Sequence, residues 1–277
     1  MLSLQKGRYV ARLAQTPADI SAAQILRALC FRVIPGGHGP AVGGPDACSP
    51  ATDSPSADRP DVDAFDGFYT HVLIEDVRSG ALVCCFRLLD LPSGEDIQRS
   101  YSAQYYDLER LSEFEGAMAE LGRFCIHPDC HDPDILRVAW GALTRHVDHR
   151  GVQMLFGCTS FRGTDPARFA GAFDLLRKRH LAPRRWQPGV KAAEVVCFGA
   201  DMAGVGVVPP AIATSKSEGR ASVLELPPLL RTYLLMGGWV GDHAVIDRDL
   251  GTLHVFTGLE IRAIPAGRAR LLRAVAG

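Results

Sequence analysis

Seven residues of types that bind ligands or move protons follow one another in the first half of the chain. They are Arg27, Phe31, Asp63, Asp66, Arg87, Glu120 and Arg123. Glu120 and Arg123 lie within the apolar stretch AELGRFCI (119–126), which has the composition of a buried strand. Buried charges are costly unless they are paired or used, so this stretch predicts either a structural ion pair or a functional site.

The spacing of Glu120 and Arg123 needs an explanation, because three residues apart on a regular strand they point to opposite faces. Gly122 between them favours a β-bulge that turns both toward one cleft. There Glu120 is the candidate general base, directly or through water, and backbone N–H groups at a splayed strand pair would stabilise an oxyanion. The alternative for both residues is an ion pair that holds adjacent strands together.

The other residues of the series also allow two interpretations each. Asp63 and Asp66 could receive the ammonium groups of a cationic amino acid, or belong to a solvated loop and a helix cap. Arg87 could hold a substrate carboxylate, although pairing with one of these aspartates is favoured. Arg27 and Phe31 could line the entrance to a substrate site, or form an ordinary helix face.

Helices and strands with clear boundaries must position these side chains. Thr16-Pro17, Asp132-Pro133 and Asp165-Pro166 each place a capping side chain before a proline, which predicts three helix starts. Strand-like runs occur at 70–76, 81–89, 119–126 and 154–161, and Pro227-Pro228 predicts a later short helix, followed by further strands. This order predicts a mixed α/β sheet with helices on its faces, not a strictly alternating doubly wound fold.

Composition limits the class of protein. The 277 residues are 47% hydrophobic with a net charge of −1, which is typical of a globular protein without a general basic field for nucleic acid. We expect a cytoplasmic protein, because no signal peptide or bilayer-spanning run is evident. The eight cysteines form no CxxC pair, which predicts reduced thiols. The spacing C-x-H-x-x-C-H at 125–131 matches no common structural zinc site, so no metal is predicted.

Four longer stretches in combination resemble a known family. They are FDGFYTHVLIED (65–76), ELGRFCIHP (120–128), LFGCTSFRGTDP (155–166) and PPLLRTYLLMGGWVGDHAVIDRD (227–249). The chain resembles, from Tyr9 to about Phe256, the bacterial ornithine Nα-acyltransferases of ornithine-lipid synthesis, which are GNAT-type enzymes related to acyl-homoserine-lactone synthases. The resemblance implies a GNAT-like mixed, splayed central sheet flanked by helices, with a C-terminal helix-strand extension. We expect a core at 1–203 with a flexible insert at 35–60, and an extension at 204–277 packed on the core.

The resemblance also implies an activity: transfer of a 3-hydroxyacyl chain from acyl carrier protein to the α-amine of L-ornithine. Glu120 and Arg123 would be catalytic, and Arg27, Phe31, Asp63, Asp66, Arg87 and Ser160 would bind substrate. No cofactor is expected, because the acyl-phosphopantetheine of the carrier is a substrate. The inner-membrane surface and the second acyltransferase of the pathway are further partners to consider. Alternatives are an acyl-homoserine-lactone synthase, acylation of another amino acid such as glutamine, and a non-catalytic module that binds the carrier.

The donor is inferred from an absence. Acyl-CoA-dependent relatives carry a glycine-rich loop for pyrophosphate after this strand, whereas the chain has HPDCHDPD (127–134), which is acidic and lacks glycine. A basic region offers docking for an acidic carrier protein or anionic lipid, or is simply a solvated helix end. Its members are Arg177, Lys178, Arg179, Arg184 and Arg185. Asp242, Asp247 and Asp249 could help to bind the acceptor, but turn and surface roles are favoured.

Overall fold

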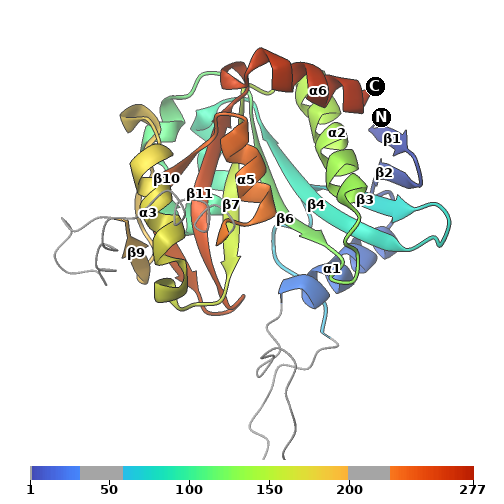
Figure 1. The fold of residues 1–277 in the computed structure, drawn as a ribbon, viewed down its shortest axis with the longest axis horizontal. Helices are drawn as coiled ribbons and strands as arrows, with labels where there is room; N and C mark the ends of the chain where they lie inside the picture. Colours follow the sequence, from blue (N-terminus) through green and yellow to red (C-terminus); the bar gives the residue numbers. More distant parts are fainter. Residues whose placement is uncertain (1, 32–58, 199–224) are drawn as a thin grey trace, which may run out of the picture.

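A nine-stranded mixed sheet forms the centre of the molecule (Figure 1). The computed structural model describes residues 2–31, 59–198 and 225–277. The strand order is β1-β2-β3-β4-β6-β7-β11-β10-β9, and among these neighbours β6 and β7 are parallel while the other pairs are antiparallel. The predicted fold class, a mixed sheet flanked by helices, is confirmed.

The predicted helix starts and strands are found with small shifts. The strands are β1 (Ser3–Lys6), β2 (Tyr9–Leu13), β3 (Thr70–Asp76), β4 (Leu82–Leu91), β5 (Tyr106–Asp107), β6 (Met118–Ile126), β7 (Met154–Arg162), β8 (Gly189–Val190), β9 (Val195–Cys197), β10 (Trp239–Asp247) and β11 (Thr252–Glu260). The α-helices are α1 (Pro17–Phe31), α2 (Pro133–Arg150), α3 (Ala170–Arg179), α5 (Pro228–Leu235) and α6 (Ala266–Ala276). Short 3-10 turns include η2 (Ser102–Gln104), η4 (Pro166–Phe169) and η5 (Arg184–Trp186).

Side-chain capping explains the helix starts. Thr16, Asp132 and Asp165 each accept a hydrogen bond from a backbone N–H two or three residues further along the chain. The third start differs from the prediction, because the residues after Asp165 form the 3-10 turn η4 before α3 begins.

Helices cover the two faces of the sheet differently. On one face, α1 packs its Ala23 and Leu26 against Leu73 of β3 and against Cys85 and Cys125. On the other face, α2 and Tyr233 of α5 share a core with strand residues such as Val72. Because successive strand residues point to opposite faces, this alternation places the helices in separate layers.

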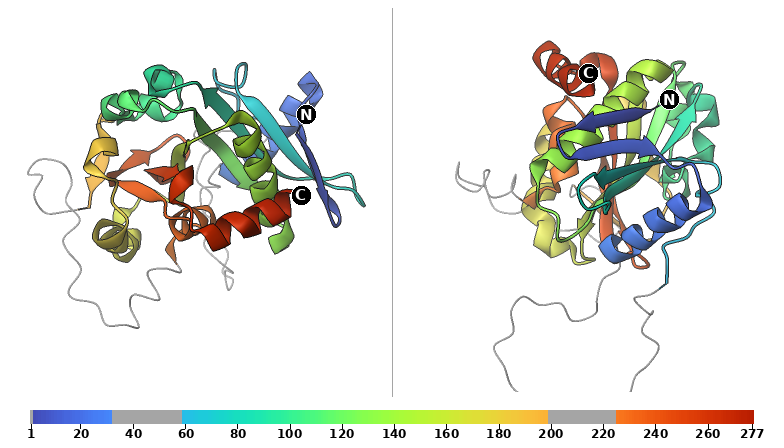
Figure 2. Two further views of the ribbon diagram at one scale, coloured as in Figure 1. Left: turned by 90° about the horizontal axis from the view of Figure 1, so that it is seen from above. Right: turned by 90° about the vertical axis from the view of Figure 1, so that its right-hand side faces the viewer.

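The C-terminal part of the chain is built into the sheet. β11 lies between β7 and β10, and its register with β7 runs from Thr252↔Arg162 to Glu260↔Met154. α6 packs against α2, close to the N-terminal β1–β2 hairpin (Figure 2). The boundary predicted at 203/204 stays a prediction, since residues 199–224, like most of the predicted insert at 35–60, lie outside the described residues.

Candidate active site

A cleft opens in the middle of the sheet, where β6 and β7 separate. The two strands pair from Met118↔Met154 to Glu120↔Phe156, and the ladder ends there although both strands continue. Gly157 follows this last pair, and a Cβ atom on it would collide with the carbonyl oxygen of Leu121. Beyond this point the gap widens into a cleft of about 260 Å³, and the backbone groups that face it have no ladder partner in the opposite strand.

A β-bulge in β6 aims the two charged residues into this cleft. The register between β4 and β6 shifts between Cys85 and Arg87. Arg123 has a φ of 50°, in the left-handed region that non-glycine residues seldom adopt. The bulge was expected at Gly122 and lies one residue later. Glu120 and Arg123 therefore both line the cleft.

Glu120 is 1% exposed, and hydrogen-bond donors hold its carboxylate in place. Oε2 accepts from the hydroxyl of Tyr69 and from the backbone N–H of Tyr101 (2.8 Å). Oε1 accepts from the backbone N–H (2.8 Å) and the hydroxyl (2.5 Å) of Ser102. Burial and the nearby Glu120 raise the pKa of Tyr69, which keeps its hydroxyl protonated as a donor. The carboxylate thus has a fixed position at the narrow end of the cleft.

A closed ring of alternating charges includes Arg123, which lines the cleft together with Glu120. Three arginines and three aspartates form it, in the order Arg27, Asp61, Arg123, Asp63, Arg87, Asp66 and back to Arg27. The nitrogen–oxygen distances around the ring are 2.8, 3.0, 3.2, 2.6, 2.7 and 2.6 Å. Each arginine in the ring therefore contacts two carboxylates, and the three positive and three negative charges balance.

Burial and pairing act in opposite directions on the ring aspartates. Burial alone would raise the pKa of Asp66, but hydrogen bonds from Arg27 and Gln24, with the charges of Arg27 and Arg87, hold this pKa well below its usual value. The pKa of Asp63 is lowered too, since its bonds to Arg87 outweigh its burial. Both carboxylates are therefore ionised at neutral pH.

Strands β7, β10 and β11 form the opposite wall of the cleft. Ser160, Asp247 and His254 line it, and Ser160 is the register partner of His254. Asp247 has the predicted turn role, because its Oδ1 accepts the backbone N–H of Leu250 in the β10–β11 turn (2.9 Å). The predicted surface role is wrong, because the residue is only 6% exposed and lines the cleft.

The cleft has a polar side and an apolar side, because it passes through the sheet. Glu120, Ser160 and His254 lie on one face, whereas Leu121 and Thr159 alternate with these residues and lie on the other. On this second face the lining continues with apolar residues of α2 and α5, namely Leu136, Pro228 and Leu229. Two chemically different reactants could therefore meet within the gap.

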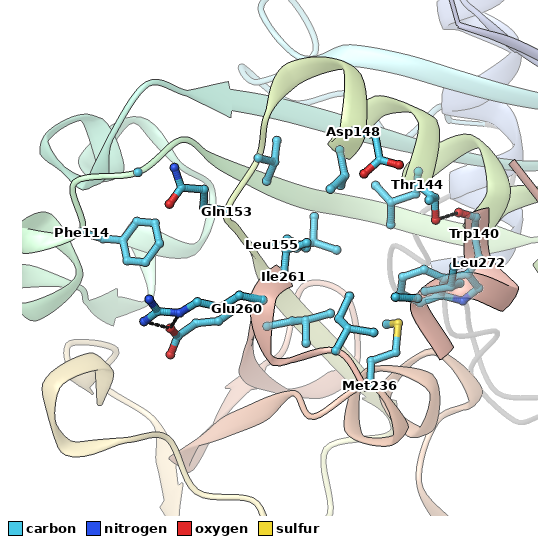
Figure 3. Close-up of a pocket in the computed structure, with 18 of the residues that line it drawn as sticks. Phe114, Trp140, Thr144, Asp148, Gln153, Leu155, Met236, Glu260, Ile261 and Leu272 are labelled. Atoms are coloured by element: carbon cyan, nitrogen blue, oxygen red, sulfur yellow. Dashed lines mark hydrogen bonds and ion pairs between the residues drawn. The ribbon is translucent and has the colours of Figure 1, made fainter. Parts of the chain in front are cut away.

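A larger apolar chamber lies further along the same two helices (Figure 3). Its volume is about 680 Å³, and its walls include Leu143 of α2, Leu155 of β7 and Met236 after α5. Trp140 and Tyr233, one turn back on α2 and α5, stack edge to face with ring centroids 5.4 Å apart. Trp140 itself lines the chamber, and in the sequence of each helix this aromatic pair follows the residues that line the cleft.

The structure brings the predicted site residues together in two groups. Glu120, Arg123, Phe31 and Ser160 line the cleft. Arg27, Asp63, Asp66 and Arg87 lie in the charged ring, where the favoured pairing of Arg87 with an aspartate is present. Direct contact between these four residues and a substrate stays a prediction.

The predicted docking residues lie elsewhere. Arg177 and Lys178 pair with Asp174 on α3, while Arg185, in η5, pairs with Glu260. Their role, with that of Arg179 and Arg184, stays a prediction.

Several site residues were missed from the sequence. Asp61 completes the ring, Tyr69, Tyr101 and Ser102 hold Glu120, and His254 lines the cleft. Tyr69 lies within the quoted stretch 65–76, but no motif marks Tyr101 and Ser102. These two belong to a short 3-10 connection whose importance comes only from tertiary contacts. Among the described residues no group of three or more His, Cys, Asp or Glu side chains could hold a metal ion, and no helix in these ranges is long and apolar enough to cross a bilayer.

The chain is similar to known acyltransferases. Residues 48–141 match the acetyltransferase (GNAT) domain family. The chain resembles L-ornithine Nα-acyltransferases: it is 29% identical to that of Rhodobacter capsulatus, over 92% of this chain and 91% of the relative, and 28% identical to that of Brucella abortus, over 93% and 86%. A solved structure with weaker similarity is FeeM, an N-acyl amino acid synthase from uncultured soil microbes (10% identity, TM-score 0.41, 93% of this chain and 94% of that chain).

Proposed function

We propose that the protein transfers a 3-hydroxyacyl chain from acyl carrier protein to the α-amine of L-ornithine. The observation that carries the proposal is the cleft between β6 and β7, which has carboxylates on its polar face and an apolar lining on the other. The similarity to L-ornithine Nα-acyltransferases over nine-tenths of the chain supports an N-acyltransferase with L-ornithine as its acceptor.

The proposed reaction needs no covalent enzyme intermediate. The amine nitrogen attacks the thioester carbonyl carbon, the C–N bond forms, the C–S bond breaks, and the pantetheine thiol leaves with a proton. Glu120, directly or through a water, takes the proton that the amine must lose. Backbone N–H groups on the strand edges beyond the Glu120↔Phe156 pair are available to the oxyanion.

The start of α2 supports a carrier-bound donor over a coenzyme A thioester. Asp132 caps this helix: its carboxylate accepts from Asp134 N–H (2.9 Å) and from the Tyr9 hydroxyl (2.8 Å). In the preceding loop, Cys130 N–H donates to the carbonyl of His127 (2.9 Å). A diphosphate would meet a carboxylate and engaged N–H groups there, whereas a phosphopantetheine arm brings no diphosphate to this position. The arm itself is a substrate, so we expect no cofactor.

The chamber offers space for a long acyl chain. Its volume lies within the range of about 300–1,000 Å³ typical of ligand sites, and most of its lining is apolar. A chain anchored by its thioester in the cleft would pass Trp140 and Tyr233 to enter it. Each buried methylene would contribute about 0.8 kcal/mol to binding.

The direct test is to incubate the purified protein with 3-hydroxyacyl carrier protein and L-ornithine and to analyse the extract by mass spectrometry. We expect Nα-acylated ornithine and free carrier thiol in equal amounts. Absence of Nα-acylated ornithine, or carrier binding without any acyl transfer, would contradict the proposal.

Filling the chamber should shorten the chains that the protein accepts. Ala269 of α6 lines the chamber, so Ala269→Trp is expected to lower kcat/KM about tenfold for donors long enough to reach it, through the loss of about two buried methylenes. Four-carbon donors should react as before.

The matched control is Ala274→Trp, on the exposed side of the same helix. Values of kcat/KM measured for donors of increasing acyl-chain length show whether the acyl chain enters the chamber. Equal profiles for the two variants would show that the chain does not enter the chamber.

A further inference from the structure

The cleft contains more negative charge than its arginines can balance. The ring of Arg27, Arg87 and Arg123 with three aspartates is neutral as a whole. Two carboxylates that line the cleft, those of Glu120 and Asp247, do not belong to this ring. Glu120 accepts from hydroxyls and backbone N–H groups, and Asp247 has no ion-pair partner among the described residues. The cleft therefore has the electrostatics of a site for a ligand with positive groups.

Asp247 is held by backbone groups only. Its Oδ1 accepts the N–H of Leu250 at 2.9 Å, and the backbone of Asp249 also contributes. Burial raises the pKa of Asp247, whereas the pKa of the paired Asp63 and Asp66 is lowered. A buried carboxylate without a cationic partner is costly, and a ligand ammonium would supply that partner.

His254, on the same wall of the cleft, has a ring nitrogen that can accept a hydrogen bond and receives none from the described residues. The Tyr106 hydroxyl donates its single proton to the carbonyl oxygen of His254 (2.8 Å), so its oxygen accepts from Nδ1–H of the ring (3.1 Å). The opposite nitrogen, Nε2, then carries a lone pair; it is buried and has no hydrogen-bond partner among the described residues. Burial, helped by the charges of Arg123 and His243, lowers the pKa of His254 to about 3, which keeps the ring neutral.

The register places these two acceptors near each other. His254 pairs with Val245, and Asp247 pairs with Thr252, so Asp247 and His254 are diagonal neighbours on one face of the β10–β11 pair. Such neighbours lie about 7–8 Å apart, which leaves room for a group bound between them, and Nε2 of His254 makes no hydrogen bond to Asp247.

We propose that Asp247 and Nε2 of His254 form a subsite for the second, side-chain ammonium of a diamino acid acceptor. The α-amine of the same molecule lies toward Glu120, so two uncompensated carboxylates receive two ammonium groups. The subsite rests on the proposed function and deepens it. Binding of the side-chain ammonium by Asp247 and His254 would cause the preference for a diamino acid over a neutral amino acid.

The test compares L-ornithine with L-norvaline, which has the same carbon chain without the terminal amine. In Asp247→Asn, kcat/KM for ornithine is expected to fall about 10- to 100-fold, the value of one charge-assisted hydrogen bond, while that for norvaline changes little. The matched control is Asp249→Asn, which makes the same charge change on an exposed residue of the adjacent turn and should keep the ornithine preference.

A binding measurement keeps the subsite testable without catalysis. L-Ornithine should raise the melting temperature of the unaltered protein more than norvaline does, and Asp247→Asn should abolish the difference. An unchanged ornithine-to-norvaline ratio in Asp247→Asn, or equal thermal shifts in the unaltered protein, would overturn the subsite. A protein that distinguishes the two ligands but acylates neither would instead overturn the proposed function.

Discussion

Glu120→Gln is expected to lower kcat for amine acylation about 10²- to 10⁴-fold, the usual contribution of a positioned general base. The amide cannot accept the proton that the attacking amine loses, while the side chain keeps its size. The rate of thiol release from the acyl carrier protein, measured with a thiol reagent, gives kcat and KM separately. The KM for the carrier thioester should change little, because the proposed docking residues on α3 and η5 lie outside the cleft.

Two further variants distinguish catalysis from folding. In Glu120→Gln the amide NH₂ must face a backbone N–H of Tyr101 or of Ser102, and the loss of that acceptor costs about 1–3 kcal/mol of stability. Ser102→Ala removes a donor to Glu120 but leaves the carboxylate, so it should lose stability without a comparable loss of kcat. Glu109→Gln, on an exposed residue, should change neither quantity. Activity of Glu120→Gln within tenfold of the unaltered protein would remove Glu120 from the role of base.

Asp66→Asn is expected to lower the free energy of unfolding at pH 7 by about 3–5 kcal/mol, the cost of leaving buried charges without their partner. The substitution opens the charged ring at both links of Asp66, with Arg27 and with Arg87, and both arginines are 1% exposed. Urea denaturation at equilibrium measures the change. The control is Asp134→Asn, which removes an exposed ion pair with Arg137 and should have little effect.

The ring also predicts how stability depends on pH. The pKa of Asp63 and Asp66 is lower in the folded protein than the unfolded value of about 4. Their contribution to stability is therefore fully present above that pH and is lost as the pH falls through the lowered folded values. Asp66→Asn should show a smaller loss of stability between neutral and acid pH than the unaltered protein. Parallel stability–pH curves for the two proteins would contradict this assignment.

Local signals explain why much of the fold was predicted from the sequence. Capping residues before prolines mark helix starts through short-range hydrogen bonds, as at Thr16 and Asp132, and apolar runs mark buried strands. The bulge was also foreseen, since two charges three residues apart on a buried strand require a change of face. Which residue adopts the left-handed conformation depends on the pairing with β4, and Arg123 takes it instead of Gly122.

The site was predicted less completely, because its missing members act through contacts that are distant in the sequence. Ser102, the first residue of η2, donates to Glu120 of β6, and Asp61 joins two arginines that are almost one hundred residues apart. Asp247 looked like a turn residue, since it precedes Arg248 and Asp249 in a polar segment. Its burial follows from the place of β10 in the sheet, and no local pattern gives that place.

The position of β11 inside the sheet has a consequence for how the chain acquires its structure. β7 is synthesised long before β11, and until β11 inserts beside it, the edge of β7 remains unpaired next to the gap that forms the cleft. Pairings so distant in sequence carry a large loop-closure entropy and form slowly. The nascent chain therefore exposes an unpaired strand edge while residues 163 to 251 are being made, and during that interval the edge is open to pairing with other chains.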